Sequence, residues 1–250
     1  MNNTVKIWGT INDGEIEIQS LTEADLEEAL NILDKSFFLY ESVCNACEIN
    51  LPKNIQARSE LRELCRLTAQ DGVSLVAKNV ANGALVAVAF NKIQFNPDEG
   101  TEPFFLEFRN KQTASPQAQR LMDFMIEVDS ETDVFEVFQI DCLCELMFLA
   151  TLPQWERKGI GRSLAHYTIE MTRDLCQGVG LENIHPSLRM RRPRAVTALF
   201  TSLFSQKVGR SQGFRLLNSV PYTKFNYNGK PFHKKISPLS KTCDHVAIVF

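Results

Sequence analysis

The stretch that most constrains the fold is a long apolar run followed by a basic segment with two glycines. Residues 142–152 are nearly all apolar, interrupted only by Glu145, as expected of a central strand buried on both faces. Residues 154–164 then read QWERKGIGRSL. Apolar residues recur at helical spacing from Ile160 to Leu175, which predicts a helix that begins at or just after the glycines. The sequence therefore predicts a buried strand, a glycine turn and a helix, in that order.

This order of elements suits the binding of an anion. Glycine lacks a Cβ, so the backbone at Gly159 and Gly161 can curve tightly and approach a ligand. The first amides of a helix are unpaired and the helix dipole adds positive charge there, which Arg157, Lys158 and Arg162 would strengthen. The segment matches neither the P-loop pattern nor the three-glycine dinucleotide pattern. An ordinary turn with solvated basic residues is the alternative.

The rest of the chain predicts a mixed α/β sheet in one domain of 250 residues, with residues 1–13 as a flexible N-terminal extension. Asn82-Gly83 predicts the turn of a hairpin. The order of elements places one parallel crossover at the centre of the sheet. Strands are predicted at 15–19, 73–77, 84–90, 195–200, 215–219 and 245–250, and helices at 23–38, 54–69, 117–128 and 202–212.

The composition of the chain limits the classes of partner that we expect it to bind. Formal net charge is −3, so no overall basic field points to nucleic acid. The longest apolar run, residues 146–150, is far too short to span a bilayer, and residues 1–19 show no apolar core of signal-peptide length. Seven cysteines without such a signal predict free thiols in the cytoplasm, with Cys44 and Cys47 as a less favoured redox or half-zinc pair. We expect a monomer without a metal.

The segment Arg157-Lys158-Gly159-Ile160-Gly161-Arg162 resembles motif A of the GNAT superfamily, the acetyl-CoA-dependent N-acetyltransferases. The resemblance implies a mostly antiparallel twisted sheet with a central parallel crossover, flanked by helices. It also implies a strand end that binds the pantetheine arm and amides that hold the CoA pyrophosphate. Glu156 departs from the pattern, which has arginine or glutamine at that position. The implied cosubstrate-binding residues are Leu149, Ala150, Thr151, Arg157, Lys158, Gly159, Ile160, Gly161, Arg162 and Ser163.

Two further segments resemble the insect-type arylalkylamine N-acetyltransferases. In residues 37–42, FFLYES, the resemblance assigns Glu41 as general base, although Ser42 replaces the family's proline. In residues 201–208, TSLFSQKV, it assigns Thr201 and Ser205 to catalysis, and these two would share one face of a helix if both were helical. Without the resemblance, Glu41 reads as a solvated acid beyond a helix. Thr201 and Ser205 likewise read as helix-capping residues.

The resemblance implies transfer of an acetyl group from acetyl-CoA to a small arylalkylamine such as dopamine, serotonin, octopamine or tryptamine, by direct attack in a ternary complex. Two alternatives are an N-acetyltransferase for an aliphatic amine or polyamine, and a non-catalytic CoA-binding module. An aliphatic or polyamine acceptor would require acids beyond Glu41 in the substrate pocket. The basic segment Arg189–Arg194 is either a solvated loop, a contact for the CoA 3′-phosphate, a weak nuclear signal or a site for an acidic partner.

Overall fold

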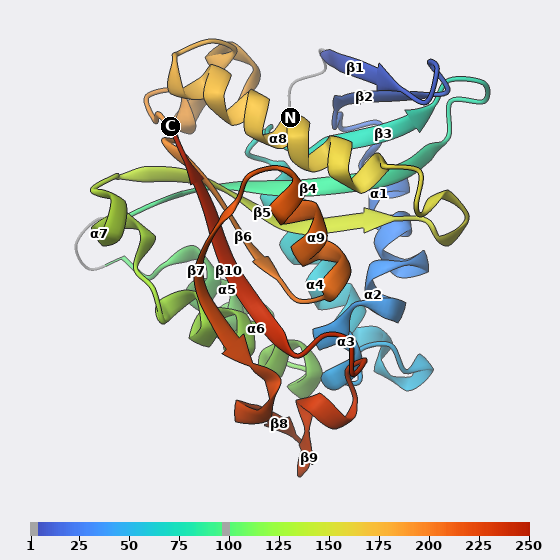
Figure 1. The fold of residues 1–250 in the computed structure, drawn as a ribbon, viewed down its shortest axis with the longest axis vertical. Coiled ribbons are helices and arrows are strands. Elements are labelled where there is room, and N and C mark those ends of the chain that lie inside the picture. Colours follow the sequence, from blue (N-terminus) through green and yellow to red (C-terminus); the bar gives the residue numbers. More distant parts are fainter. Residues whose placement is uncertain (1–4, 97–100) are drawn as a thin grey trace.

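An eight-stranded sheet runs through the part of the chain that the structure describes. The computed structural model describes residues 5–96 and 101–250. The strand order is β1-β2-β3-β4-β5-β6-β10-β7 (Figure 1), and only β5 and β6 run parallel. The predicted mixed sheet with a central parallel crossover is confirmed. Its strands are β1 (Ile7–Ile11), β2 (Ile16–Ser20), β3 (Leu75–Asn79), β4 (Leu85–Phe95), β5 (Cys142–Thr151), β6 (Ala195–Phe200), β7 (Arg215–Pro221) and β10 (Thr242–Val249); β8 (Asn226–Tyr227) and β9 (Lys230–Pro231) form a separate pair.

Helices cover both faces of this sheet. Figure 1 shows α8 and α9 in front of it and α4, α5 and α6 behind it, and each face packs its own apolar core. The α8 side buries Ile160, Leu164 and Leu175 at the spacing read from the sequence. The helices are α1 (Leu26–Lys35), α2 (Phe37–Tyr40), α3 (Ser42–Ala46), α4 (Ile55–Ala69), α5 (Phe104–Gln112), α6 (Pro116–Ser130), α7 (Val134–Phe138), α8 (Ile160–Cys176) and α9 (Leu203–Ser211).

The parallel strands β5 and β6 separate soon after they meet. They pair at Cys144 with Val196 and at Glu145 with Thr197, and the described residues show no further pairing between them. On its other side β5 stays paired with β4 as far as Thr151. Met147 is an extra residue there, because Phe90 pairs with Phe148 and the next residue of β4 pairs with Leu146. Such a bulge bends a strand, so β5 turns away from β6 and leaves a gap between their ends.

The helix predicted at residues 23–38 is two helices in the structure. α1 ends at Lys35, and α2 follows after Ser36, whose backbone leaves the helical region (φ −135°, ψ −73°). The Ser36 hydroxyl donates a hydrogen bond to the carbonyl of Ile32, at 2.7 Å. Serine side chains compete in this way with the backbone pairing of a helix. The break turns the chain so that Glu41 follows α2 at an angle that a continuous helix would not give.

The prediction of a flexible N-terminal extension is wrong for Ile7–Ile11. These residues form β1, which pairs antiparallel with β2, while residues 1–4 lie outside the described residues. Trp8 donates its indole N–H to Ser20 at 3.1 Å. Gly9 accommodates Tyr167 of α8, since a Cβ there would lie 2.0 Å from the phenol oxygen. An edge strand held by contacts with distant residues leaves little periodic signal in its own sequence.

No helix among the described residues is both long and apolar enough to cross a membrane.

Gly209 fixes the position of α9 on β6. A Cβ there would lie 2.3 Å from Cε2 of Phe200, whose ring is buried against Phe214. We predict that Gly209→Ala lowers the free energy of unfolding by about 1–3 kcal/mol because the added methyl overpacks this contact. Urea denaturation measures the change. The matched control is Gly161→Ala in α8, whose Cβ would have no neighbour nearer than 3.8 Å. It should gain up to about 1 kcal/mol from helix propensity. Equal effects of the two variants would contradict the packing argument.

Candidate active site

A cavity of about 400 Å³ lies where β5 and β6 separate. Its walls come from β5, the end of β6, α6, the turn between α2 and α3, and the start of α9. Six residues assigned from the sequence line this one cavity, although they come from three distant parts of the chain. They are Glu41, Leu149, Ala150, Thr151, Thr201 and Ser205.

Glu41 is held by three hydrogen bonds at the junction of α2 and α3. Its carboxylate caps α3 by accepting from the amides of Val43 at 2.9 Å and Cys44 at 2.7 Å. The third donor is the hydroxyl of Thr201, 2.6 Å from Oε1. Two of these bonds reach Oε1 and one reaches Oε2. Because a carboxylate has about four acceptor positions, one position on Oε2 stays available. Glu41 is therefore not merely a solvated acid.

Thr201 connects Glu41 to the rest of the fold. It directly follows β6, and its carbonyl accepts a hydrogen bond of 2.5 Å from the hydroxyl of the buried Tyr222. α9 begins only at Leu203, so Thr201 is not helical and the shared helical face with Ser205 does not form. The residue is neither a cap nor part of the helix. Its side chain instead donates to Glu41.

Ser205 takes part in the capping of α9. Its hydroxyl donates to the Ser202 carbonyl at 3.0 Å and accepts from the Ser202 amide at 3.1 Å. The Ser202 hydroxyl accepts from the Ser205 amide at 3.1 Å, which completes a capping box. The capping interpretation thus holds for Ser205, with Ser202 as the N-cap. The Ser205 side chain also lines the cavity, facing the space that Glu41 faces.

The N-terminus of α8 lies against the end of β5. A Cβ at Gly161 would be 3.8 Å from the Thr151 hydroxyl and 3.9 Å from the Leu149 side chain. Gly159 is the N-cap in the left-handed region (φ +79°), and no side chain caps this helix. The first intrahelical bond runs from the Ser163 amide to the Gly159 carbonyl, at 3.0 Å. The preceding amides of the first turn are therefore free to bind a ligand.

The charged side chains around the N-terminus of α8 differ in whether they have partners within the protein. Arg157 and Arg162 make no hydrogen bond or ion pair within the described residues, so both cations are free. The Lys158 ammonium lies 3.7 Å from a carboxylate oxygen of Glu15 and 4.3 Å from the centre of the Trp155 ring. Glu156, the departure from the motif, lines the cavity instead of pointing away from it. Lys158 therefore does not neutralise Glu156.

The fold is shared with solved insect N-acetyltransferases. Arylalkylamine N-acetyltransferase 2 from Aedes aegypti aligns with a TM-score of 0.76 and 21% identity, over 94% of this chain and 98% of that chain. The putative arylalkylamine N-acetyltransferase 7 from the same mosquito gives 0.74 and 18%, over 98% and 95%. The polyamine N-acetyltransferase of Drosophila melanogaster, described as forming N-acetylagmatine, gives 0.72 and 16%, over 94% and 100%. No family model and no curated protein matches the sequence.

The chain has the GNAT fold. At these identities the likeness concerns the fold and does not fix the reaction.

Within this GNAT fold, the basic segment Arg189–Arg194 lies far from the glycine turn. It follows the C-terminal end of α8, whose 17 residues span about 25 Å. Arg191 stacks on the Phe95 ring at 4.0 Å, and Arg192 donates to the carbonyls of Arg189 and Arg191. This placement argues against the alternative in which the segment contacts the CoA 3′-phosphate.

The cysteines offer no nucleophile to the cavity. All seven are free thiols, and both Cys44 and Cys47 are buried. Burial raises the pKa of Cys44 and of Cys47 well above the usual range, so neither is a thiolate at neutral pH. Among residues 5–96 and 101–250, no group of three or more His, Cys, Asp or Glu is placed to hold a metal ion.

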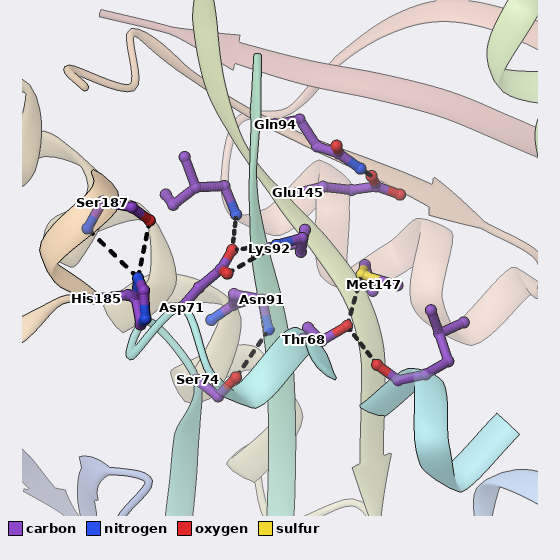
Figure 2. Close-up of polar contacts among 12 residues, drawn as sticks. Thr68, Asp71, Ser74, Asn91, Lys92, Gln94, Glu145, Met147, His185 and Ser187 are labelled. Atoms are coloured by element: carbon purple, nitrogen blue, oxygen red, sulfur yellow. Dashed lines mark hydrogen bonds and ion pairs between the residues drawn. The ribbon is translucent and has the colours of Figure 1, made fainter. Parts of the chain in front are cut away.

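The sequence analysis missed a second group of ionisable residues, Glu145, Asp129 and His245. Burial and the nearby Asp129 raise the pKa of Glu145 to about 8, and Gln94 donates a hydrogen bond to it at 3.1 Å (Figure 2). Desolvation and Asp133 raise the pKa of Asp129 to about 6, although about half of its side chain (53%) is exposed. Burial lowers the pKa of His245 to about 4, and its Nε2 lies 3.6 Å from Asp129. The signal in the sequence was Glu145 itself, the lone acid in an apolar strand.

Glu145 should make the folded state less stable as pH rises. Its pKa is about 8 when folded and near 4.5 when unfolded, so between these values the folded protein holds more protons. The shifts of Asp129 and His245 act below pH 6.5, which leaves the range 6.5–8 to Glu145. We predict that wild type loses up to about 2 kcal/mol of unfolding free energy across this range relative to Glu145→Gln.

Urea denaturation at pH 6.5 and 8 measures this difference. Glu127→Gln, which removes an exposed acid from the same helix as Asp129, is the control and should follow wild type. Parallel pH profiles of wild type and Glu145→Gln would contradict the assignment.

Proposed function

We propose that the protein is an acetyl-CoA-dependent N-acetyltransferase that acts on the primary amine of a small molecule. One observation carries the proposal: a single cavity joins the Glu41–Thr201 pair to the free end of β5, beside the uncapped N-terminus of α8. The resemblance to motif A and the likeness in fold to insect N-acetyltransferases support it. We expect the protein to act in the cytoplasm.

The residues around the glycine turn fit acetyl-CoA. The free first-turn amides of α8, with Arg157 and Arg162, supply donors and positive charge for a pyrophosphate. Beyond Glu145, no strand among the described residues pairs with β5 on its β6 side, so backbone groups of Leu149–Thr151 are available to an extended pantetheine arm. Bound there, acetyl-CoA supplies the acetyl group as a thioester. The full set proposed to bind it is Leu149, Ala150, Thr151, Arg157, Lys158, Gly159, Ile160, Gly161, Arg162 and Ser163.

Glu41 would act as the general base. An alkylamine has a pKa of roughly 10, so it arrives as an ammonium that cannot attack a thioester. The carboxylate attracts this cation and takes its proton at the open position on Oε2, directly or through water. Thr201 and the two α3 amides hold the carboxylate in place, so Thr201 acts as a positioning residue.

The deprotonated amine then attacks the acetyl carbonyl directly. A backbone amide near Thr151 stabilises the oxyanion that forms, and the C–S bond breaks as the carbonyl re-forms. The Ser205 hydroxyl, which lines the cavity, would rotate away from the Ser202 carbonyl to donate a hydrogen bond to the departing sulfur. The attacking nitrogen loses its second proton as the amide forms, and the departing thiolate takes up this proton, so CoA leaves as the thiol. No acyl-enzyme is needed, which agrees with the protonated, buried cysteines around Glu41.

The cavity walls support an acceptor with an apolar body. Arylalkylamines such as dopamine, serotonin, octopamine and tryptamine are the acceptors that the sequence resemblance implies. Aromatic rings interact favourably with other rings at their edges and faces. The aromatic residues that line the cavity are Phe37, Tyr40, Phe105, Phe148, Phe200 and Phe204.

Release of CoA thiol with an amine panel tests the proposal. The panel should include tryptamine, dopamine, octopamine, serotonin and aliphatic mono- and diamines. We expect thiol release above the amine-free rate with at least one acceptor. A non-catalytic CoA-binding module would instead be heat-stabilised by acetyl-CoA and release no thiol with any amine, and that result would refute the enzymatic proposal.

Glu41→Gln separates catalysis from helix capping. The side-chain amide of glutamine keeps one oxygen that can still accept from an α3 amide, but it cannot take a proton at neutral pH. We predict a fall in kcat of about 10²–10⁴-fold, the usual contribution of a general base, with a loss of stability of at most about 1 kcal/mol. Steady-state kinetics and urea denaturation measure the two effects.

The matched control is Asp133→Asn. Asp133 caps α7 with its side chain but does not line the cavity. This variant should lose stability to a similar extent and keep its kcat. A kcat for Glu41→Gln close to that of wild type would remove Glu41 from the mechanism and leave the enzymatic proposal standing.

Glu156 and Arg162 should affect acetyl-CoA binding in opposite directions. Exposed charge pairs contribute about 0.2–1 kcal/mol, which corresponds to roughly 1.4-fold to fivefold in Kd. We predict that Glu156→Gln tightens binding by this factor and that Arg162→Gln weakens it by the same factor. Calorimetry at low salt measures both, and added salt should shrink both effects. Lys158→Gln is the control and should change Kd less, because its ammonium faces Glu15. Weaker binding by Glu156→Gln would contradict the placement of the pyrophosphate.

A further inference from the structure

The cavity holds a second acidic site away from Glu41. Glu145 pairs with Thr197 at the point where β5 and β6 part, and Asp129 of α6 lines the same cavity. Thr201, the partner of Glu41, lies four residues beyond Thr197 along the chain. At about 3.3 Å per residue, the two acidic sites are about 13 Å apart along β6.

Glu145 has no cation of its own. Its neighbour across the β4–β5 pair is Lys92, whose ammonium instead binds both oxygens of Asp71, at 2.7 and 2.8 Å. Figure 2 shows Lys92 directed to Asp71 and Glu145 beside Gln94. Within the described chain, the Gln94 amide is the hydrogen-bond donor to Glu145, and no ion pair reaches it. Two carboxylates thus face one cavity without a positive charge to balance them.

His245 contacts Asp129 and adds a buried polar group next to this acidic site, although it is not among the residues that line the cavity. The side chain is 1% exposed, and neither ring nitrogen has a hydrogen-bond partner among the described residues. Its Nε2 points to Asp129 at 3.6 Å. Buried polar atoms without partners are rare in folded proteins, and each one needs an explanation. With a neutral imidazole, the site stays net negative and can accept several hydrogen bonds.

We propose that the acceptor carries a second cationic group, a terminal ammonium or guanidinium, which Glu145 and Asp129 bind while the reacting amine lies at Glu41. The inference rests on the proposed function and names its substrate class as aliphatic diamines or amino-guanidines. Charge-assisted hydrogen bonds to two carboxylates are stronger than the bonds a hydroxyl would make there. The cavity that both acidic sites line also has an apolar wall, which suits a methylene chain. It includes Met122, Met125, Phe148 and Leu199.

The test compares acceptors that differ only in the second charge. The pair is hexylamine and 1,6-diaminohexane, assayed by thiol release with acetyl-CoA, with phenethylamine and tyramine as a pair that differs in a hydroxyl. In wild type, kcat/KM should be at least tenfold higher for the diamine, mainly through KM. Glu145→Gln should reduce this diamine-to-monoamine ratio at least tenfold, and Asp129→Asn should also reduce it. Glu127→Gln, an exposed acid on α6, should keep the wild-type ratio.

Each other outcome has a defined meaning. A wild-type ratio near one would overturn the inference and leave the proposed function intact. Wild type could instead prefer tyramine over phenethylamine, show no preference for the diamine, and lose the tyramine preference in Glu145→Gln. This result would also overturn the inference, because Glu145 would then bind a hydroxyl group and not a cation. If no amine releases thiol, the proposed function fails and the inference with it. If Glu145→Gln does not fold, the wild-type ratio and Asp129→Asn decide.

Discussion

The separation of β5 from β6 after a single short stretch of pairing is the constraint on which the site depends. Glu145 and Thr197 are the last paired residues, and the bulge at Met147 bends β5 away just beyond them. Had the strands stayed paired, their side chains and backbone groups would close the space in which the cavity lies. The separation instead exposes the end of β5 beside the N-terminus of α8, and it turns Thr201 toward Glu41.

The contact of Thr201 with Glu41 joins residues 160 positions apart in the chain. The Glu41 carboxylate has two structural roles, because Oε1 accepts from Thr201 while both of its oxygens cap α3. A capping carboxylate is already fixed in orientation, so little further ordering is needed for it to accept a proton. The buried hydroxyl of Tyr222, bonded to the Thr201 carbonyl, extends this rigidity to the C-terminal part of the sheet.

Elements with a local signal were predictable from the sequence, and contacts across the fold were not. The apolar periodicity after Gly159 predicted α8, and the run that begins at Cys142 predicted β5. β1 was missed because it depends on Trp8 and Tyr167 contacts with distant elements. The glycine turn was interpreted as an anion site from its own residues, whereas Glu41, Thr201 and Ser205 were assigned by resemblance. Nothing local could show that Thr201 precedes α9 and donates to Glu41.

Glu145 is a residue whose type is informative in the sequence but whose role depends on the fold. A lone acid in a buried strand is visible in the sequence, but its meaning depends on what faces it, and Asp129 and His245 come from other elements. Their placement gives the two ends of the cavity different chemistry. Glu41 accepts three hydrogen bonds from the protein, whereas Glu145 has one amide donor and a pKa raised to about 8. Glu41, whose orientation is fixed by its hydrogen bonds, can act as a base in each turnover. Glu145, which lacks a counter-charge, is stabilised most when a cation binds. The two acids would therefore have different roles, Glu41 in catalysis and Glu145 in substrate selectivity.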